Sequence, residues 1–178
     1  LFFGETLSTA QLVELARDVR AEALAGAKDA PEPQRLAAAL DKAARDLRLA
    51  GPGEGTRITA ASLARERAFS DSLAALALAL ASMGEALETV AERSEGLARC
   101  SERARRAQGL LEGWRDESRA DLVRWAEVLS HSLRLNATPL SVAEIFRKQL
   151  DGRRRAWIFT SATLAVTGDF GHYRKEMG

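Results

Sequence analysis

A repeat of apolar residues at alternating steps of three and four constrains this chain more than any other feature of its sequence. The repeat begins at Leu73, and its later positions are Leu76, Leu80, Met83, Leu87, Val90, Ser94, Leu97, Ser101, Ala104, Gln108 and Leu111. This heptad spacing places all positions on one face of an α-helix, and another helix must cover that face. The pattern predicts a chain that is helical nearly throughout residues 59–111.

The two halves of the repeat differ in polarity. The first half is fully apolar, whereas Ser94, Ser101 and Gln108 interrupt the second half. We therefore expect the first half to be buried and the second half to project or to pack more loosely. The segment Ser82-Met83-Gly84 is the expected bend, because Gly weakens a helix interior by about 1 kcal/mol.

Two shorter helices are predicted before this repeat. Ser8 and Gln11 fit a capping box, so the first helix starts at Ser8 or Thr9, and Gly26 with residues 28–31 ends it. Its expected buried face is Leu12, Leu15, Ala16, Val19 and Ala23. The second helix covers residues 32–50, with a buried stripe of Leu36, Ala39, Leu40, Ala43, Leu47 and Ala50. A Gly-rich turn at residues 51–55 follows it.

Charged residues on the second helix, Lys42, Arg45 and Arg48, indicate a solvated face. Because each short helix needs an apolar partner, the chain favours an antiparallel bundle over the alternative, a free-standing coiled-coil dimer. After residue 121 the period changes to two, and residues 122–128 and 133–137 predict a β-hairpin with a turn near Ser130 and His131. The predicted fold class is mainly α with a small β element.

A short apolar run, residues 156–159, leads into the hydroxyl-rich sequence Thr160, Ser161, Ala162 and Thr163. The run is typical of a buried strand. From the residues alone it fits an ordinary core strand that leaves through a polar turn. It also fits a ligand-contacting strand end, because ligands bind at the carboxyl ends of strands in open α/β sheets.

Residues 158–164, Ile-Phe-Thr-Ser-Ala-Thr-Leu, resemble motif III of superfamily 2 helicases. Flanking segments resemble the DinG/YoaA branch of the XPD-like DNA helicases: residues 136–143, Phe146, residues 168–170 and residues 177–178. Residues 1–4, with Leu7, Ser8, Gln11 and Leu12, resemble the segment just after the DEAH box of that family.

The resemblance implies a fragment of an ATP-dependent 5′-to-3′ DNA helicase of the bacterial cytoplasm, because the chain starts at Leu1 rather than Met and ends just beyond motif III. Residues 1–120 would be the helical Arch insertion, a wall of the single-stranded DNA channel. Residues 121–178 would return to motor domain 1, with Thr160, Ser161, Ala162 and Thr163 as the motif III coupling element.

The parent helicase is implied to use ATP, Mg²⁺ and a 4Fe–4S cluster, yet none of these would bind here. The sequence has no G-x-x-x-x-G-K-[ST] loop, no Asp-Glu-Ala-His and only one Cys, Cys100. We therefore expect no catalytic residue, no metal site and no ATPase activity in this chain alone. Its expected partners are single-stranded DNA and the rest of the helicase motor, with no membrane, and residues 154–166 can self-associate without their sheet neighbours.

Four arginines, Arg99, Arg103, Arg105 and Arg106, form the candidate nucleic-acid contact. They can follow a phosphate backbone. Basic residues near the C-terminal end of a helix also complement the helix macrodipole, so the cluster can equally be a solvated helix end. The formal net charge is only +1, so DNA binding would depend on such local clusters. A helical protein-interaction module is the competing class, and it requires an exposed apolar stripe between Leu73 and Val90. A small independent enzyme is discounted, because the two His, one Cys and scattered carboxylates form no convergent group.

Overall fold

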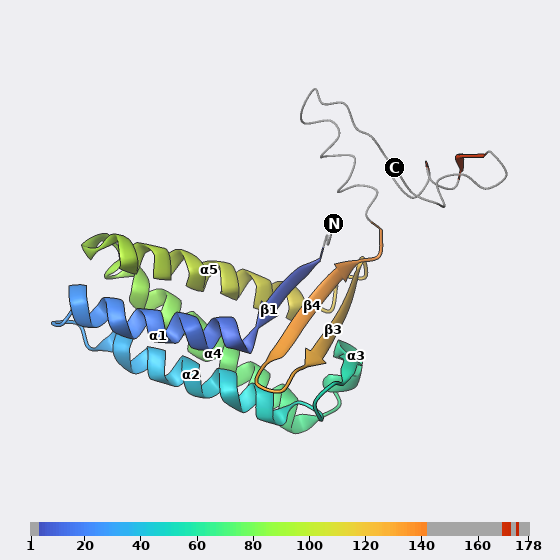
Figure 1. Ribbon diagram of the computed structural model, residues 1–178, viewed down its shortest axis with the longest axis horizontal. Helices are drawn as coiled ribbons and strands as arrows, with labels where there is room; N and C mark the ends of the chain where they lie inside the picture. Colours follow the sequence, from blue (N-terminus) through green and yellow to red (C-terminus); the bar gives the residue numbers. More distant parts are fainter. Residues whose placement is uncertain (1–3, 142–168, 172–173, 175–178) are drawn as a thin grey trace.

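The computed structural model describes residues 4–141, 169–171 and 174. Its elements in chain order are β1 (Glu5–Ser8), α1 (Thr9–Gly26), α2 (Glu32–Ala50), β2 (Arg57–Thr59), α3 (Ala60–Leu63), α4 (Arg67–Glu88), the 3₁₀ turn η1 (Ala91–Arg93), α5 (Glu95–Arg115), β3 (Leu122–Val128) and β4 (Leu133–Pro139). Figure 1 shows a helical bundle with a small sheet packed at one end of it. The predicted mainly α fold with a small β element is confirmed.

Local signals fix the first two helices. The Ser8 hydroxyl accepts a hydrogen bond from the Gln11 amide at 3.2 Å, and the Gln11 side chain accepts one from the Ser8 amide at 2.9 Å. This reciprocal capping box starts α1 at Thr9, as predicted, and all five residues of its predicted apolar face are buried. The predicted bounds of α2 are also confirmed.

The predicted buried stripe of α2 is partly wrong. Ala39 is exposed, whereas Ala37 and Ala44 are fully buried. The difference arises because α2 packs against two helices, α1 and α4, so its buried arc is wider than one stripe and is centred differently. The solvated-face prediction holds for Lys42 and Arg45, which pair with acids on α2 itself. It is wrong for Arg48, whose Nε donates to the Leu129 carbonyl at 2.8 Å.

The continuous helix predicted across the heptad repeat is also wrong. The chain leaves helical geometry after Glu88, forms η1, and starts α5 at Glu95. The Ser94 hydroxyl caps α5 by accepting from the Leu97 amide at 3.1 Å. A Cβ at Gly84 would lie 3.6 Å from Gln108, and Glu88 pairs with Arg105, so α4 and α5 run antiparallel. The expected bend at Ser82-Met83-Gly84 does not occur, because α4 continues through it.

Both halves of the repeat are therefore buried, each against the other. Leu76, Leu80, Met83 and Leu87 from α4 are fully buried, and so are Leu97 and Ala104 from α5. The expectation that the second half packs loosely is wrong, because the fold-back gives both halves a partner. The exposed apolar stripe that an interaction module would need between Leu73 and Val90 is not present on this face. Helix α4 is long and apolar enough to span a membrane by length and composition alone, but its leucine face lies in this core.

Replacing Ser94 with Ala is expected to lower the free energy of unfolding by about 1 kcal/mol, because the α5 amide that it caps loses its acceptor. Chemical denaturation followed by circular dichroism measures this. Ser82→Ala in the interior of α4 is the matched control, and we expect it to change stability little, since Ala is the better helix former. Equal losses in both variants would mean that Ser94 does not act as a cap.

The sheet has the order β1-β4-β3-β2, and all neighbouring strands are antiparallel. The predicted hairpin is confirmed: Leu129 and Ser132 close its turn with a 2.8 Å backbone hydrogen bond, and His131 is exposed. Strand β2 was not predicted. The expected helical segment began at Thr59, and that boundary is wrong, because Thr59 ends β2 and caps α3. One face of the sheet, with Leu7, Ala126 and Leu135, packs on the bundle.

This sheet joins strands from both sides of residue 120, where we divided the chain into two domains; the division itself stays a prediction. The apolar run at residues 156–159 and the motif III element that follows it lie outside the described residues.

Candidate nucleic-acid interface

Helix α5 holds the four candidate arginines on its solvent side. Its other side is buried over the full length of the helix, from Leu97 through Ala104 and Leu111 to Trp114. Because α5 packs against both α4 and α1 on that side, polar residues between the buried positions face outward. All four arginines are exposed, as the helicase interpretation requires.

The helical period separates these arginines into two groups. Arg99, Arg103 and Arg106 are spaced by four and three residues, so they lie on one face of α5. Arg105 lies about 100° around the helix from Arg106. It reaches toward α4 instead, where its Nη2 lies 3.7 Å from the Glu88 carboxylate. Arg99, Arg103 and Arg106, which we call the arginine row, are the set that a single phosphate chain can contact together.

Two members of the arginine row are paired with acids. Arg99 lies 3.3 Å from Glu95 one turn earlier, and Arg103 lies 2.5 Å from Asp18 on α1. The hydrogen bond to Asp18 raises the pKa of the Arg103 guanidinium. Such exposed pairs contribute only about 0–1 kcal/mol, so a phosphate can displace the carboxylate at little cost.

Helix α1 presents acids to the arginine row. Glu14, Asp18 and Glu22 recur every fourth residue, on the side of α1 that packs against α5. A Cβ at Gly96 would come within 1.9 Å of the Glu22 carboxylate, which places the start of α5 directly against α1. The sequence prediction missed this acidic row. Its spacing of four residues was the available signal, but nothing local indicated that it would face α5.

Arg106 is the member of the row that forms no ion pair among the described residues. It lines two hollows, one of about 290 Å³ between β1, α1 and α5, and one of about 360 Å³ between β1 and α5. The smaller hollow also contains Arg103. Gly109 lines the larger one, and a Cβ there would meet no atom within 4 Å. Each hollow also contains a carboxylate, Glu14 in the smaller one and Glu5 in the larger one, so an anionic ligand at this end of α5 would meet the arginines beside an acid.

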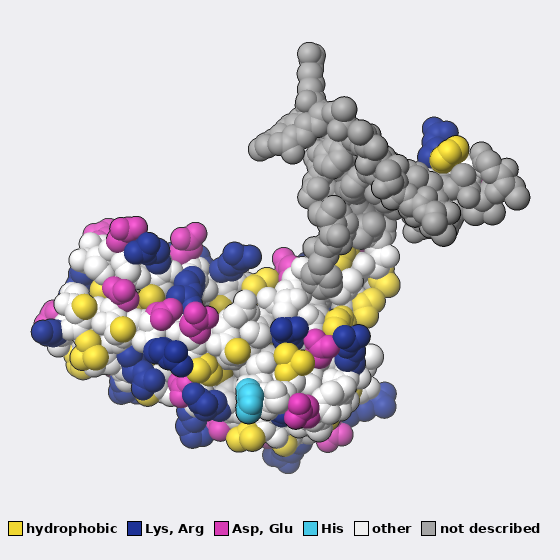
Figure 2. Space-filling view, in the orientation of Figure 1, with side chains coloured by type: hydrophobic (Ala, Val, Ile, Leu, Met, Phe, Trp, Pro, Cys, Tyr) yellow, Lys and Arg dark blue, Asp and Glu magenta, His cyan; other side chains and the backbone are white. Residues whose placement is uncertain are grey.

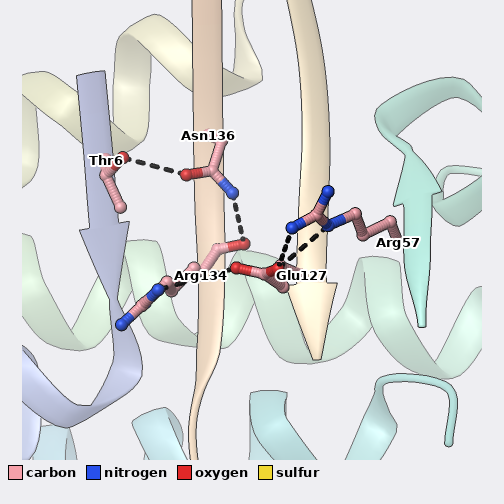
Figure 3. A network of polar contacts seen from close by, with 5 residues as sticks. All are labelled: Thr6, Arg57, Glu127, Arg134 and Asn136. Carbon is pink, nitrogen blue, oxygen red and sulfur yellow. Dashed lines mark hydrogen bonds and ion pairs between the residues drawn. The ribbon is translucent and has the colours of Figure 1, made fainter. Parts of the chain in front are cut away.

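A second polar surface, which the sequence prediction also missed, lies on the face of the sheet turned away from the bundle. Figure 3 shows Glu127 between two arginines, with Arg57 Nε at 2.9 Å and Arg134 Nη1 at 3.6 Å. Asn136 Oδ1 accepts from the Thr6 hydroxyl at 2.9 Å. These contacts connect all four strands. Arg57 comes from β2, a strand that the sequence pattern did not predict, so no signal identified it.

No part of the chain that the structure describes contains a group of three or more His, Cys, Asp or Glu able to hold a metal ion. Cys100 lies on the buried side of α5, and burial raises the pKa of its thiol. A raised pKa leaves the thiol protonated and unreactive, as is usual for a buried structural cysteine. One buried thiol does not fit an iron–sulfur cluster, which requires four thiolates. The predicted coupling residues, Thr160 to Thr163, lie outside the described residues.

Comparison with known proteins found helicases. The chain is 29% identical over 178 residues to the ATP-dependent DNA helicase YoaA of Haemophilus influenzae, and 30% identical over 177 residues to that of Escherichia coli. Each match covers 99% of this chain but 28% of the relative, so the chain spans less than a third of the length of these proteins. No family model matches the chain, and no solved structure matches it.

Both matches extend through the bundle, the hairpin and residues 142–178. They therefore include the segments that resemble motif III and its flanks, and also the helical region, which has no motif of its own. The resemblance of this chain to the DinG/YoaA branch of the XPD-like DNA helicases is therefore confirmed over nearly its whole length.

Proposed function

We propose that this chain is the helical Arch insertion and the following motor-domain segment of an ATP-dependent 5′-to-3′ DNA helicase of the bacterial cytoplasm or nucleoid. The observation that carries the proposal is the match over 99% of the chain to two helicases named ATP-dependent. The fold supports it, because an insertion that forms a rigid wall needs a continuous core, and α1, α2, α4 and α5 share one.

In this function the arginine row forms part of the wall of the single-stranded DNA channel. Arg103 and Arg106 both line the smaller hollow next to β1, where a phosphate would meet two guanidinium groups beside the Glu14 carboxylate. Arg105 contributes less, since it reaches toward Glu88 on α4. Thr160, Ser161 and Thr163 would couple the nucleotide cycle to DNA movement, because hydroxyl groups exchange hydrogen-bond partners without moving charge.

The chain alone is expected to hydrolyse no ATP. Its sequence lacks the Gly-rich loop and Lys that hold nucleotide phosphates, and it lacks the Asp-Glu-Ala-His carboxylates that handle Mg²⁺. ATP, Mg²⁺ and the iron–sulfur cluster would therefore be bound by other parts of the parent helicase. DNA and the rest of the motor are the proposed partners of this segment.

Neutralising the arginine row is expected to reduce the salt dependence of single-stranded DNA binding. Fluorescence anisotropy of a labelled oligonucleotide across a salt series measures it. Each phosphate contact adds about 0.7 to the slope of log K against log salt, so Arg99→Gln/Arg103→Gln/Arg106→Gln should lower the slope by about 2. Arg105→Gln should change it little.

The matched control is Arg35→Gln/Arg67→Gln/Arg119→Gln, which removes the same charge from exposed arginines elsewhere. A control that lowers the slope equally would show that only net charge matters. Absence of binding even at low salt would contradict the channel-wall role, and the Arch segment would then serve a structural or partner-docking role.

A further inference from the structure

The solvent side of α1 differs in chemistry from the side that faces α5. Ala10, Val13, Arg17, Arg20 and Leu24 recur at spacings of three and four, so they form one stripe along the helix. Arg17 and Arg20 are exposed, and neither forms an ion pair with another residue in the described part of the chain. Apart from Glu14 at its border, this stripe carries no acid, because Asp18 and Glu22 lie toward α5.

Helix α2 and the hairpin turn extend this stripe into a groove. A hollow of about 520 Å³ lies between α1 and α2, and it is lined by Val13, Glu14, Arg17, Ala44, Arg45, Arg48, Leu49 and His131, together with the start of α1. Figure 2 shows basic and apolar side chains next to one another over α1 and α2. We call the groove and the α1 stripe together the α1–α2 groove.

The apolar part of the α1–α2 groove is unusually exposed. Leu49 is 78% exposed at one end of the surface, and Leu24 is 55% exposed at the other. Alanines and Val13 lie between them. Leu49 lines the hollow, and Leu24 lies beyond it on the α1 stripe. Exposed leucines that share one surface mark an interaction site more often than scattered single residues do. A partner that places apolar side chains over this surface would remove both leucines from water.

The charged part of the groove is predominantly basic. Three arginines and one carboxylate, Glu14, line the hollow. Arg48 donates to the carbonyls of Leu129 and Ser130, so its charge is not cancelled by an acid there. Arg45 shares its charge with Asp41, and Arg17 and Arg20 add two further positive charges. The rim therefore attracts negative groups on an occupant.

We propose that the α1–α2 groove docks an acidic amphipathic helix of a partner protein, with leucine-like anchors on Val13, Leu24 and Leu49 and carboxylates on Arg17, Arg20 and Arg45. An apolar stripe received by a groove is a recurrent mode of helix recognition, and carboxylates on the flanks select orientation. This inference does not depend on the proposed helicase role, because it uses a different face from the arginine row.

Other occupants fit the surface less well. The lining of the groove contains no Phe, Tyr or Trp, so the His131 imidazole is the one aromatic ring in that lining on which a nucleic-acid base could stack, and the leucines would stay exposed. A second copy of the same groove would place arginine against arginine across a two-fold axis, which is repulsive. An acidic helix satisfies both the apolar and the basic parts of the surface.

The test uses the 178-residue chain and a stapled, fluorescein-labelled helical peptide of about five turns, with Leu at heptad spacing and Glu on the flanks. We expect saturable binding in fluorescence anisotropy, with a Kd on the order of 10–100 µM that weakens with salt. Arg17→Glu/Arg20→Glu should weaken binding at least about tenfold, as should Leu49→Ser. Peptides with Lys in place of Glu, or Ala in place of Leu, should not bind.

The matched control is Arg65→Glu/Arg67→Glu, which reverses the same charge at exposed positions near the start of α4 and should leave binding unchanged. Circular dichroism verifies that each variant is folded, and the substituted side chains are exposed, so we expect no loss of stability. Two outcomes overturn the proposal. One is that the peptide does not bind up to about 1 mM, or that the control pair Arg65→Glu/Arg67→Glu weakens peptide binding as much as Arg17→Glu/Arg20→Glu does. The other is oligonucleotide binding that Arg17→Glu/Arg20→Glu abolishes while Leu49→Ser leaves it intact.

Discussion

Leu80→Ala is expected to lower the free energy of unfolding by about 2–5 kcal/mol. Leu80 is fully buried on α4, the helix that packs against both α2 and α5. Removing its branched end leaves a cavity where three helices meet, and the lost burial adds to the cost of that cavity. Urea unfolding followed by circular dichroism measures the change, and the melting temperature should fall by about 4–20 °C.

Leu78→Ala is the matched control, because Leu78 lies on the same helix and is 70% exposed. This substitution should change stability by less than about 0.5 kcal/mol, since Ala also favours helix slightly more than Leu does. If both variants lost the same stability, α4 would not be packed with its heptad face inward, and the fold-back of α5 onto it would be wrong.

Trp114→Ala is expected to cost about 3–5 kcal/mol, because Trp114 joins the last turn of α5 to the sheet. Its side chain is 5% exposed, and its Nε1 donates to the Asn136 carbonyl on β4 at 3.2 Å. Its own carbonyl accepts from Arg124 on β3 at 2.9 Å. The bundle and the sheet therefore meet at this residue, and its loss should weaken both.

Trp114→Phe separates packing from hydrogen bonding at the same position. Phe keeps most of the apolar surface but has no N–H donor, so we expect a smaller loss of about 1 kcal/mol from the hydrogen bond. The same denaturation experiment compares the two variants. A loss for Phe as large as the loss for Ala would mean that the hydrogen bond to Asn136, rather than packing, holds the bundle against the sheet.

The parts of the fold that sequence predicted well depend on contacts within a few residues. Ser8 and Gln11 bond to each other, and the turn after Ala50 is marked by its own Gly and Pro residues, so both were visible in the sequence. The hydrogen bond from the Gly55 amide to the distant Val128 carbonyl was not visible. The hairpin was visible for the same reason, because its alternation and its short turn are local. Strand β2 was not visible. Its three residues are held by pairing with β3, about 70 residues away, as the Arg57–Glu127 bond shows.

The heptad repeat predicted which residues are buried better than it predicted the shape of the helix. The steps of three and four continue across the break between α4 and α5. Ser94 and Leu97 still fall on the repeat, although the chain reverses direction at η1. A pattern of three and four describes a straight helix and a helical hairpin equally well. The helical hairpin forms because the second half of the stripe can then cover the first half. The Ser94 cap marks the residue at which the second helix starts.

The candidate site shows a similar limit. The four arginines were visible as a group, and the helical period alone separates Arg105 from the row of three. The sequence did not show that the row lies beside α1 and that Arg105 reaches toward α4. The acids that face them come from α1, about 85 residues earlier, as the Arg103–Asp18 pair shows. Electrostatic neighbours of this kind depend on which helices pack together, and the sequence does not state that.

Strands β1 and β4 lie side by side, with Glu5 opposite Ala137 and Ser8 opposite Arg134 (Figure 1). The chain thus enters and leaves the bundle on two neighbouring strands of the four-stranded sheet, about 4.8 Å apart. A module whose ends are this close can be carried by a larger protein as an insertion, with little rearrangement of the host. Because Leu7 on β1 and Leu135 on β4 are buried against the bundle, a displacement of the host at these two strands would move the sheet and the bundle together.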